Sequence, residues 1–121
     1  MIAYHGSQDY KDRFVKLLEW HRDQDKIVSG QYWENGQGCS VGCGINSMQI
    51  IAEEDGEDFN EDLDHEDHSL SEQYIGVPHI LYRLNDGIFE GLPRDMQQQW
   101  PIRFAAAIRP GADLSLVWAR F

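Results

Sequence analysis

The stretch SQDYKDRFVKLLEWHRDQDKIV, residues 7–28, has the side-chain spacing of an α-helix. Ser7 is a suitable N-cap, Asp9 places a negative charge in the first turn, and Gly30 supplies a C-terminal stop. The stretch therefore predicts a long first helix with one face in the core. The residues on that face recur with the 3.6-residue period, and they are Tyr10, Phe14, Leu17, Leu18 and His21.

Two later stretches also have helical spacing, and prolines delimit both of them. An aliphatic stripe begins beside Pro78, a favourable first residue of a helix, and it comprises Val77, Ile80, Leu81, Leu84 and Ile88. After Pro93, apolar residues recur every four positions at Met96, Trp100, Phe104 and Ile108. Because Pro101 lies inside this second stretch, we expect it to kink or divide the helix.

Shorter signals indicate the remaining elements. Residues 47–52 predict a short helix, and the capping-box spacing of Ser69 and Glu72 predicts another that runs to about Ile75. Residues 32–33 precede the tight-turn dipeptide 35–36, so they predict one short β-hairpin. We also expect Asp113 to cap a short terminal piece.

These patterns predict a mainly α, compact single domain over residues 1–121, with one short β-hairpin and an acidic loop insertion at 53–68. No stretch approaches the roughly 20 consecutive apolar residues of a membrane span, and the N-terminus lacks the pattern of a secretory signal. We therefore expect a cytoplasmic protein with no membrane partner. Its predicted core contains Phe14, Leu17, Leu18, Leu81, Leu84, Ile88, Phe104 and Val117.

The charge of the chain is concentrated in one place. The sequence has 21 acidic and 10 basic residues, a formal net charge of −11. Ten of the acids lie between residues 53 and 67, here called the acidic segment, and no Lys or Arg occurs from residue 27 to residue 82. The rest of the chain is nearly neutral, so direct binding to DNA or RNA is disfavoured.

The acidic segment is poorly suited to a long helix. Its many like-charge pairs spaced four residues apart each cost about 0.2–0.5 kcal/mol in a helix, and Asp and Gly are weak helix formers. We predict an extended or mobile loop, with Phe59 and Leu63 as its apolar anchors. At about 3.3 Å per residue, an extended segment carries roughly one charge per 5 Å of its length. One DNA strand carries one charge per about 3.4 Å, so the segment approaches the linear charge density of a nucleic-acid strand without reaching it.

Three interpretations of the acidic segment stay open at this stage. It is a solvated insertion that aids solubility, a surface that occupies the basic groove of a nucleic-acid-binding protein, or a chelator of metal or Ca²⁺. Under the second interpretation the partner-binding residues are Glu53, Glu54, Asp55, Glu57, Asp58, Glu61, Asp62, Asp64, Glu66 and Asp67.

The two cysteines are weak candidates for a metal site. Cys39 and Cys43 are four residues apart, so a helix would place both on one face, but tetrahedral zinc needs two more ligands. His5, His21 and His79 are available without a motif that links them. A disulfide or a catalytic cysteine is also conceivable, although two small buried thiols fit the pattern better.

Two further motifs carry weaker signals. His65 and His68 lie among carboxylates and make a second weak metal candidate, but the segment lacks the register of an EF-hand loop. The glycines of residues 36–42 lack the Lys-Ser or Lys-Thr pair that follows a phosphate-binding loop. We therefore assign no cofactor and no catalytic residue.

Five motifs give the chain a resemblance to a family of small bacterial and phage proteins: AYHG (3–6), YWENGQGC (32–39), GC (42–43), DGIFEGLP (86–93) and PGADLSLVW (110–118). The resemblance covers nearly the whole chain apart from the acidic segment. It implies no catalytic residue, because the family has no assigned activity. Members of the family have a shorter connection where residues 52–73 lie here and often a longer C-terminal extension. The resemblance thus implies an acidic binding surface inserted into an older scaffold.

The leading hypothesis is a phage-type inhibitor that acts as a nucleic-acid mimic rather than as an enzyme. Its partner would be a host defence protein with a basic nucleic-acid-binding groove, such as a Cas effector or a restriction protein, so it would be an anti-CRISPR or anti-restriction protein in the host cytoplasm. One alternative is a small metalloprotein or enzyme with a Cys/His site. Another is a structural or interaction module with a solubilising acidic loop.

Overall fold

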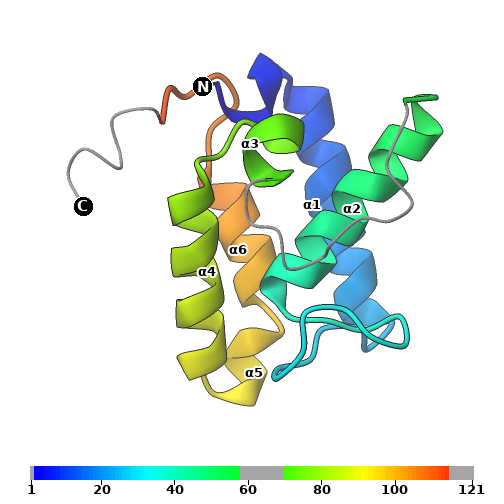
Figure 1. Cartoon of the computed structure of the whole chain (residues 1–121), viewed down its shortest axis with the longest axis vertical. Helices are drawn as coiled ribbons and strands as arrows, with labels where there is room; N and C mark the ends of the chain where they lie inside the picture. Colours follow the sequence, from blue (N-terminus) through cyan, green and yellow to red (C-terminus); the bar gives the residue numbers. More distant parts are fainter. Residues whose placement is uncertain (1, 58–69, 115–121) are drawn as a thin grey trace.

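The fold is mainly α-helical, as the sequence predicts (Figure 1). The computed structural model describes residues 2–57 and 70–114. Their elements are η1 (Ala3–Gly6), α1 (Gln8–Asp23), α2 (Ser40–Glu54), α3 (Leu70–Ile75), α4 (His79–Gly91), α5 (Arg94–Gln97) and α6 (Trp100–Ala107).

The longer helices enclose one hydrophobic core. α1 packs against α2 and α6, and α4 packs against α2 and α6 from the other side; in Figure 1, α6 lies between α4 and α1. Phe14 and Leu18 of α1 meet Ile45 and Met48 of α2 in this core, and all four side chains are buried. The N-terminal half of α2 is buried on every side. α2 is therefore the central element of the described fold.

α1 begins where the sequence predicts and ends earlier. The Ser7 hydroxyl accepts a hydrogen bond from the Tyr10 amide at 3.0 Å, which confirms the N-cap. The helix ends at Asp23, not near residue 28, because Asp25 adopts a left-handed conformation (φ 56°) and the Lys26 amide then donates to the His21 carbonyl. Asp25, rather than the predicted Gly30, occupies the position that glycine usually takes in this helix ending.

The predicted β-hairpin is wrong, although its turn is confirmed. Asn35 and Gly36 both have positive φ angles, as a tight turn requires, but only isolated bridges flank it and no strand occurs in residues 2–57 or 70–114. Instead, the segment that contains Tyr32 lies directly against α2. A methyl group at Gly42 would overlap the Tyr32 carbonyl oxygen, so this glycine allows the close contact.

α2 is longer than predicted. It begins at Ser40 instead of residue 47 and continues through Glu54, so the first two residues of the acidic segment are helical. After the C-cap Asp55, Gly56 turns the chain away from the helix axis with a positive φ angle (70°), and the Glu57 amide donates to the Ala52 carbonyl. Gly42 and Gly44 are accommodated within the helix because the Tyr32 backbone and the Tyr82 side chain pack against them.

α4 buries a different face from the predicted one. Leu84 and Ile88 are 44% and 37% exposed, and the buried positions are Tyr82, Asn85 and Phe89. Asn85 is tolerated in the core because its Oδ1 accepts hydrogen bonds from Ser40 Oγ and Trp100 Nε1, both at 2.7 Å.

The other predicted core positions are largely confirmed. Phe14 and Leu18 are buried, while Leu17, Leu81 and Phe104 are partly buried and pack against the core. Val117 lies outside the described residues. The division at Pro101 is confirmed as well, because α5 ends at Gln97 and α6 begins at Trp100.

The short element α3 and the chain ends complete the fold. The Glu72 carboxylate accepts a hydrogen bond from the His79 amide at 3.0 Å and so caps α4. Ser69, its predicted partner in a capping box, lies outside the described residues. Asp113 forms an isolated bridge with Ile2, which joins the two ends of the described chain; the terminal piece beyond residue 114 is not described. Tyr4 ties η1 to α6 through its hydroxyl, which donates to the Ala105 carbonyl at 2.6 Å.

Candidate functional site

The acidic segment begins at the C-terminal end of α2, at the edge of the molecule (Figure 1). The structure describes Glu53, Glu54, Asp55 and Glu57, and all four are exposed. The remaining candidates lie outside the described residues: Asp58, Glu61, Asp62, Asp64, Glu66 and Asp67, the anchors Phe59 and Leu63, and His65 and His68. Thus four of the ten predicted partner-binding carboxylates have a defined position.

The position of these carboxylates is unfavourable for the helix that carries them. The C-terminal end of a helix has a partial negative charge, so each acidic side chain there costs about 0.3–1 kcal/mol at low ionic strength. Glu53 and Glu54 occupy the last turn of α2, Asp55 is its C-cap, and no basic residue lies in that turn. The acidic end therefore does not stabilise its own helix.

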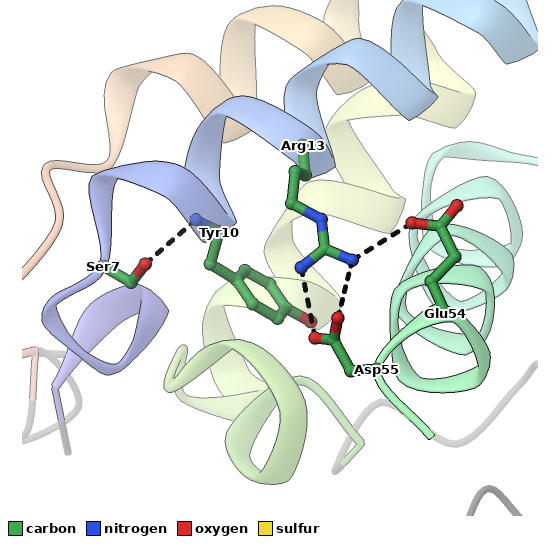
Figure 2. Close-up of polar contacts among 5 residues, drawn as sticks. All are labelled: Ser7, Tyr10, Arg13, Glu54 and Asp55. Carbon is green, nitrogen blue, oxygen red and sulfur yellow. Dashed lines mark hydrogen bonds and ion pairs between the residues drawn. The ribbon is translucent and has the colours of Figure 1, made fainter. Parts of the chain in front are cut away.

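Arg13 of α1 binds two of the four carboxylates (Figure 2). Its guanidinium donates to both Asp55 oxygens, at 3.0 and 3.1 Å, and its Nη2 also donates to Glu54 Oε2 at 3.1 Å. These charge-assisted hydrogen bonds hold the pKa of Arg13 above its usual value. Arg13 thus orients Glu54 and Asp55 and partly neutralises them.

A small cavity of about 220 Å³ adjoins the acidic end. Tyr10, His5 and Tyr74 contribute aromatic rings to its lining, and Asp55 and Glu57 contribute carboxylates. Burial, reinforced by Glu57, raises the pKa of Tyr10, which keeps its hydroxyl protonated. Figure 2 shows this hydroxyl directed toward Asp55 and Arg13. The wall of the cavity next to the acidic segment therefore combines a neutral phenol with negative charge.

The two cysteines are buried, as predicted, and both are free thiols. The Cys43 sulfur lies 3.3 Å from the Gly38 carbonyl oxygen and 3.6 Å from the Lys26 carbonyl oxygen. Burial raises the pKa of Cys43, and it raises the pKa of Cys39 to about 11. Both thiols are therefore protonated at neutral pH, which disfavours a nucleophilic role.

The histidines do not complete a zinc site with these thiols. Within the described residues, no cluster of three metal-ligating side chains contains a histidine or Cys43. His21 is buried between the Leu17 carbonyl oxygen and the Asn46 side chain, and burial lowers its pKa. His5 contacts the Tyr74 carbonyl, and His79 contacts Glu72. The predicted Cys/His combination is therefore wrong for the described histidines.

Cys39 instead lies beside two carboxylates of α4. One ligand atom each from Cys39, Asp86 and Glu90 falls within 4.8 Å of the other two. Tyr32 donates its hydroxyl to Asp86 Oδ2 at 3.0 Å, and the Gly30 amide donates to Glu90 Oε2 at 3.2 Å. No sequence motif links Cys39 to this pair, although the four-residue spacing of Asp86 and Glu90 places both carboxylates on one face of a helix.

The chain was compared with protein-family models, with curated proteins and with solved structures, and none of the three comparisons gives a match. None of the helices that the structure describes is both long and apolar enough to span a lipid bilayer. Function is therefore inferred from the residues and their geometry alone.

Proposed function

We propose that this protein is a phage-type inhibitor of a host nucleic-acid-binding defence protein, such as a Cas effector or a restriction enzyme. The acidic segment would occupy the basic groove of that partner in place of nucleic acid. One observation carries the proposal: ten carboxylates fall within residues 53–67, and the four whose positions are described are all exposed. Such a surface is complementary to a groove lined with Lys and Arg.

The placement of the acidic end supports a role in binding. Carboxylates at the C-terminal end of α2 oppose the helix dipole, and Arg13 offsets that cost only for Glu54 and Asp55. Arg13 holds Glu54 and Asp55 in place, and Gln49 donates a hydrogen bond to Glu53 Oε1 at 3.3 Å. A partly fixed set of charges loses less conformational entropy on binding than a fully mobile one.

The mechanism is steric and electrostatic, with no chemical step. Complementary charge would speed association with a basic partner. At about 0.15 M salt the Debye length is about 8 Å, so the affinity should fall as salt rises. The protein would act in the host cytoplasm, where the partner meets invading nucleic acid.

The test is displacement of fluorescently labelled target DNA from a purified, guide-loaded Cas effector, followed by anisotropy at low and high salt. In one variant, the eight segment carboxylates that do not contact Arg13 are changed to their amides. A graded variant carries only Glu53→Gln and Glu57→Gln. Its control, Asp25→Asn with Asp95→Asn, removes two exposed charges from other elements.

We expect the original protein to displace the DNA, the graded variant to do so more weakly, and the control to match the original protein. The eight-amide variant should lose displacement almost completely. If no displacement occurs with Cas effectors or with restriction enzymes tested in the same way, the inhibitor proposal is wrong. If displacement survives in the eight-amide variant, the segment only aids solubility and another surface binds the partner.

A further inference from the structure

We propose that Cys39, Asp86 and Glu90 form a binding site for a divalent transition-metal ion of the Zn²⁺ type. The thiol comes from the N-cap residue of α2, and the carboxylates come from adjacent turns of α4. Their ligand atoms lie within 4.8 Å of one another. Bonds of about 2.0–2.3 Å place tetrahedral ligands about 3.3–3.8 Å apart, which falls inside this limit.

The thiol of Cys39 is the independent sign of a ligand. Cys39 is only 1% exposed, yet its thiol donates none of the hydrogen bonds found in residues 2–57 and 70–114. Cys43, one helical turn away, has two carbonyl oxygens in reach of its sulfur. A buried thiol hydrogen without an acceptor calls for an explanation, and a metal ion that replaces this hydrogen and faces the two carboxylates would provide it.

The surrounding groups prepare the site for a cation. Tyr32 and the Gly30 amide each donate to one of the carboxylates and so restrict their orientation, as outer groups do around known metal ligands. A bound cation would compensate in part the negative charge of Asp86, Glu90 and a thiolate at Cys39.

The ligand set selects the class of metal. Thiolate favours Zn²⁺ and its neighbours over Mg²⁺ and Ca²⁺, which prefer oxygen alone, while carboxylates are also common zinc ligands. Three protein ligands leave a fourth position for water or a partner side chain. Glu90 is exposed, so an ion can reach the site from solvent. The site lies at the opposite end of α2 from the acidic segment, about 20 Å away for a helix of 15 residues.

The test is titration of the metal-free full chain with Co²⁺, a spectroscopic substitute for Zn²⁺, followed by competition with Zn²⁺. We expect one equivalent of Co²⁺ to produce the near-ultraviolet charge-transfer absorption of a thiolate ligand, and Zn²⁺ to abolish it. Cys39→Ser should remove the absorption, and Cys43→Ser should retain it. Glu90→Gln changes only an exposed side chain and should weaken binding about tenfold or more.

A control separates this site from the acidic segment. The eight-amide variant combined with His65→Ala and His68→Ala should bind Co²⁺ through the thiolate as the original protein does. The proposal is overturned if the thiolate absorption never develops or if it depends on Cys43 rather than Cys39. It is also overturned if Glu90→Gln binds Co²⁺ as tightly as the original protein. Binding of Zn²⁺ that disappears in the segment variant and persists in Cys39→Ser would equally contradict it.

Discussion

Arg13 is the residue on which the geometry of the acidic end depends. It bridges α1 to Glu54 and Asp55 through three hydrogen bonds. The guanidinium side chain is 29% exposed, so solvent and salt screen the interaction. Exposed ion pairs contribute up to about 1 kcal/mol, and the bidentate geometry places this one toward the upper end.

We therefore expect Arg13→Ala to lower the free energy of unfolding by about 0.5–1 kcal/mol at low salt. The reason is twofold, since the variant removes the ion pairs and leaves the carboxylates opposed to the helix dipole. Urea denaturation at low and high salt measures it, and Arg83→Ala, at an exposed position of α4, is the matched control. Equal stabilities of the two variants at low salt would contradict the role given to Arg13.

His21 makes the stability of the fold depend on pH. Burial holds the pKa of this side chain below its usual value of about 6.5. Below pH 6.5 the unfolded chain takes up a proton that the folded chain resists, so stability falls as the pH drops. The slope that one such group contributes is at most about 1.4 kcal/mol per pH unit.

We expect His21→Gln to be less stable than the original protein at pH 7.5, and the difference to shrink as the pH falls toward 5. Melting temperatures at several pH values would show this, because the variant lacks the titrating group while His5 and His79 remain in both proteins. A stability difference that stays constant or grows on acidification would show that His21 is not held neutral by burial.

At the scale of the element, α2 owes its form to two close contacts with neighbouring chain. Gly42 faces the Tyr32 carbonyl oxygen, and Gly44 faces the Tyr82 hydroxyl. Glycine inside a helix normally costs about 0.5–1 kcal/mol relative to alanine. Here the close approach outweighs that cost, which is why a glycine-rich sequence forms the most buried helix of the described fold.

Two glycine substitutions with opposite expected effects test this explanation. Gly42→Ala should destabilise the protein by about 1–3 kcal/mol, because its methyl group would overlap the Tyr32 carbonyl. Gly87→Ala in α4 should stabilise it by about 0.4–1 kcal/mol, since nothing lies within 4 Å of the added carbon. Thermal unfolding measures both, and an unaffected Gly42→Ala would refute the close contact.

The buried face of α4 provides a second test at this scale. Phe89→Ala should cost about 3–5 kcal/mol, as for other buried aromatic residues. Leu84→Ala should cost less than about 1 kcal/mol because Leu84 remains 44% exposed. Comparable losses for both variants in chemical denaturation would mean that the aliphatic face, and not the aromatic one, faces the core.

Local sequence signals predicted the secondary-structure elements better than the tertiary contacts between them. Ser7 and Pro101 act through neighbouring residues, and the sequence alone predicted the cap and the helix division that they produce. The buried face of α4 depends on Asn85 finding Ser40 and Trp100, which are distant in sequence. Nothing in the local pattern indicates such partners, so counting aliphatic residues selected the wrong face.

The same distinction applies to the candidate sites. The acidic segment is evident from composition, but its pairing with Arg13 depends on how α1 packs against α2. The sequence indicates Cys39 as a candidate metal ligand, and histidines were the expected co-ligands. Its actual neighbours, Asp86 and Glu90, lie far along the chain and reach Cys39 only through the contact between α2 and α4.

At the scale of the whole molecule, two features occupy opposite ends of α2. The acidic segment begins at its C-terminal end, and the Cys39 group lies at its N-terminal end. The charge balance adds to this polarity, because outside residues 53–67 the acidic and basic residues nearly cancel. A partner with a basic groove should therefore approach from the acidic end.

Carbodiimide labelling of carboxylates, read by mass spectrometry, tests the central claim most directly. It would be applied to the free protein and to its complex with any Cas effector or restriction enzyme from which it displaces DNA in the assay above. The account predicts that residues 53–67, with Glu53 and Glu57 among them, lose labelling in the complex while Asp25 and Asp95 keep theirs. Unchanged labelling across the acidic segment, together with protection of carboxylates elsewhere, would contradict it.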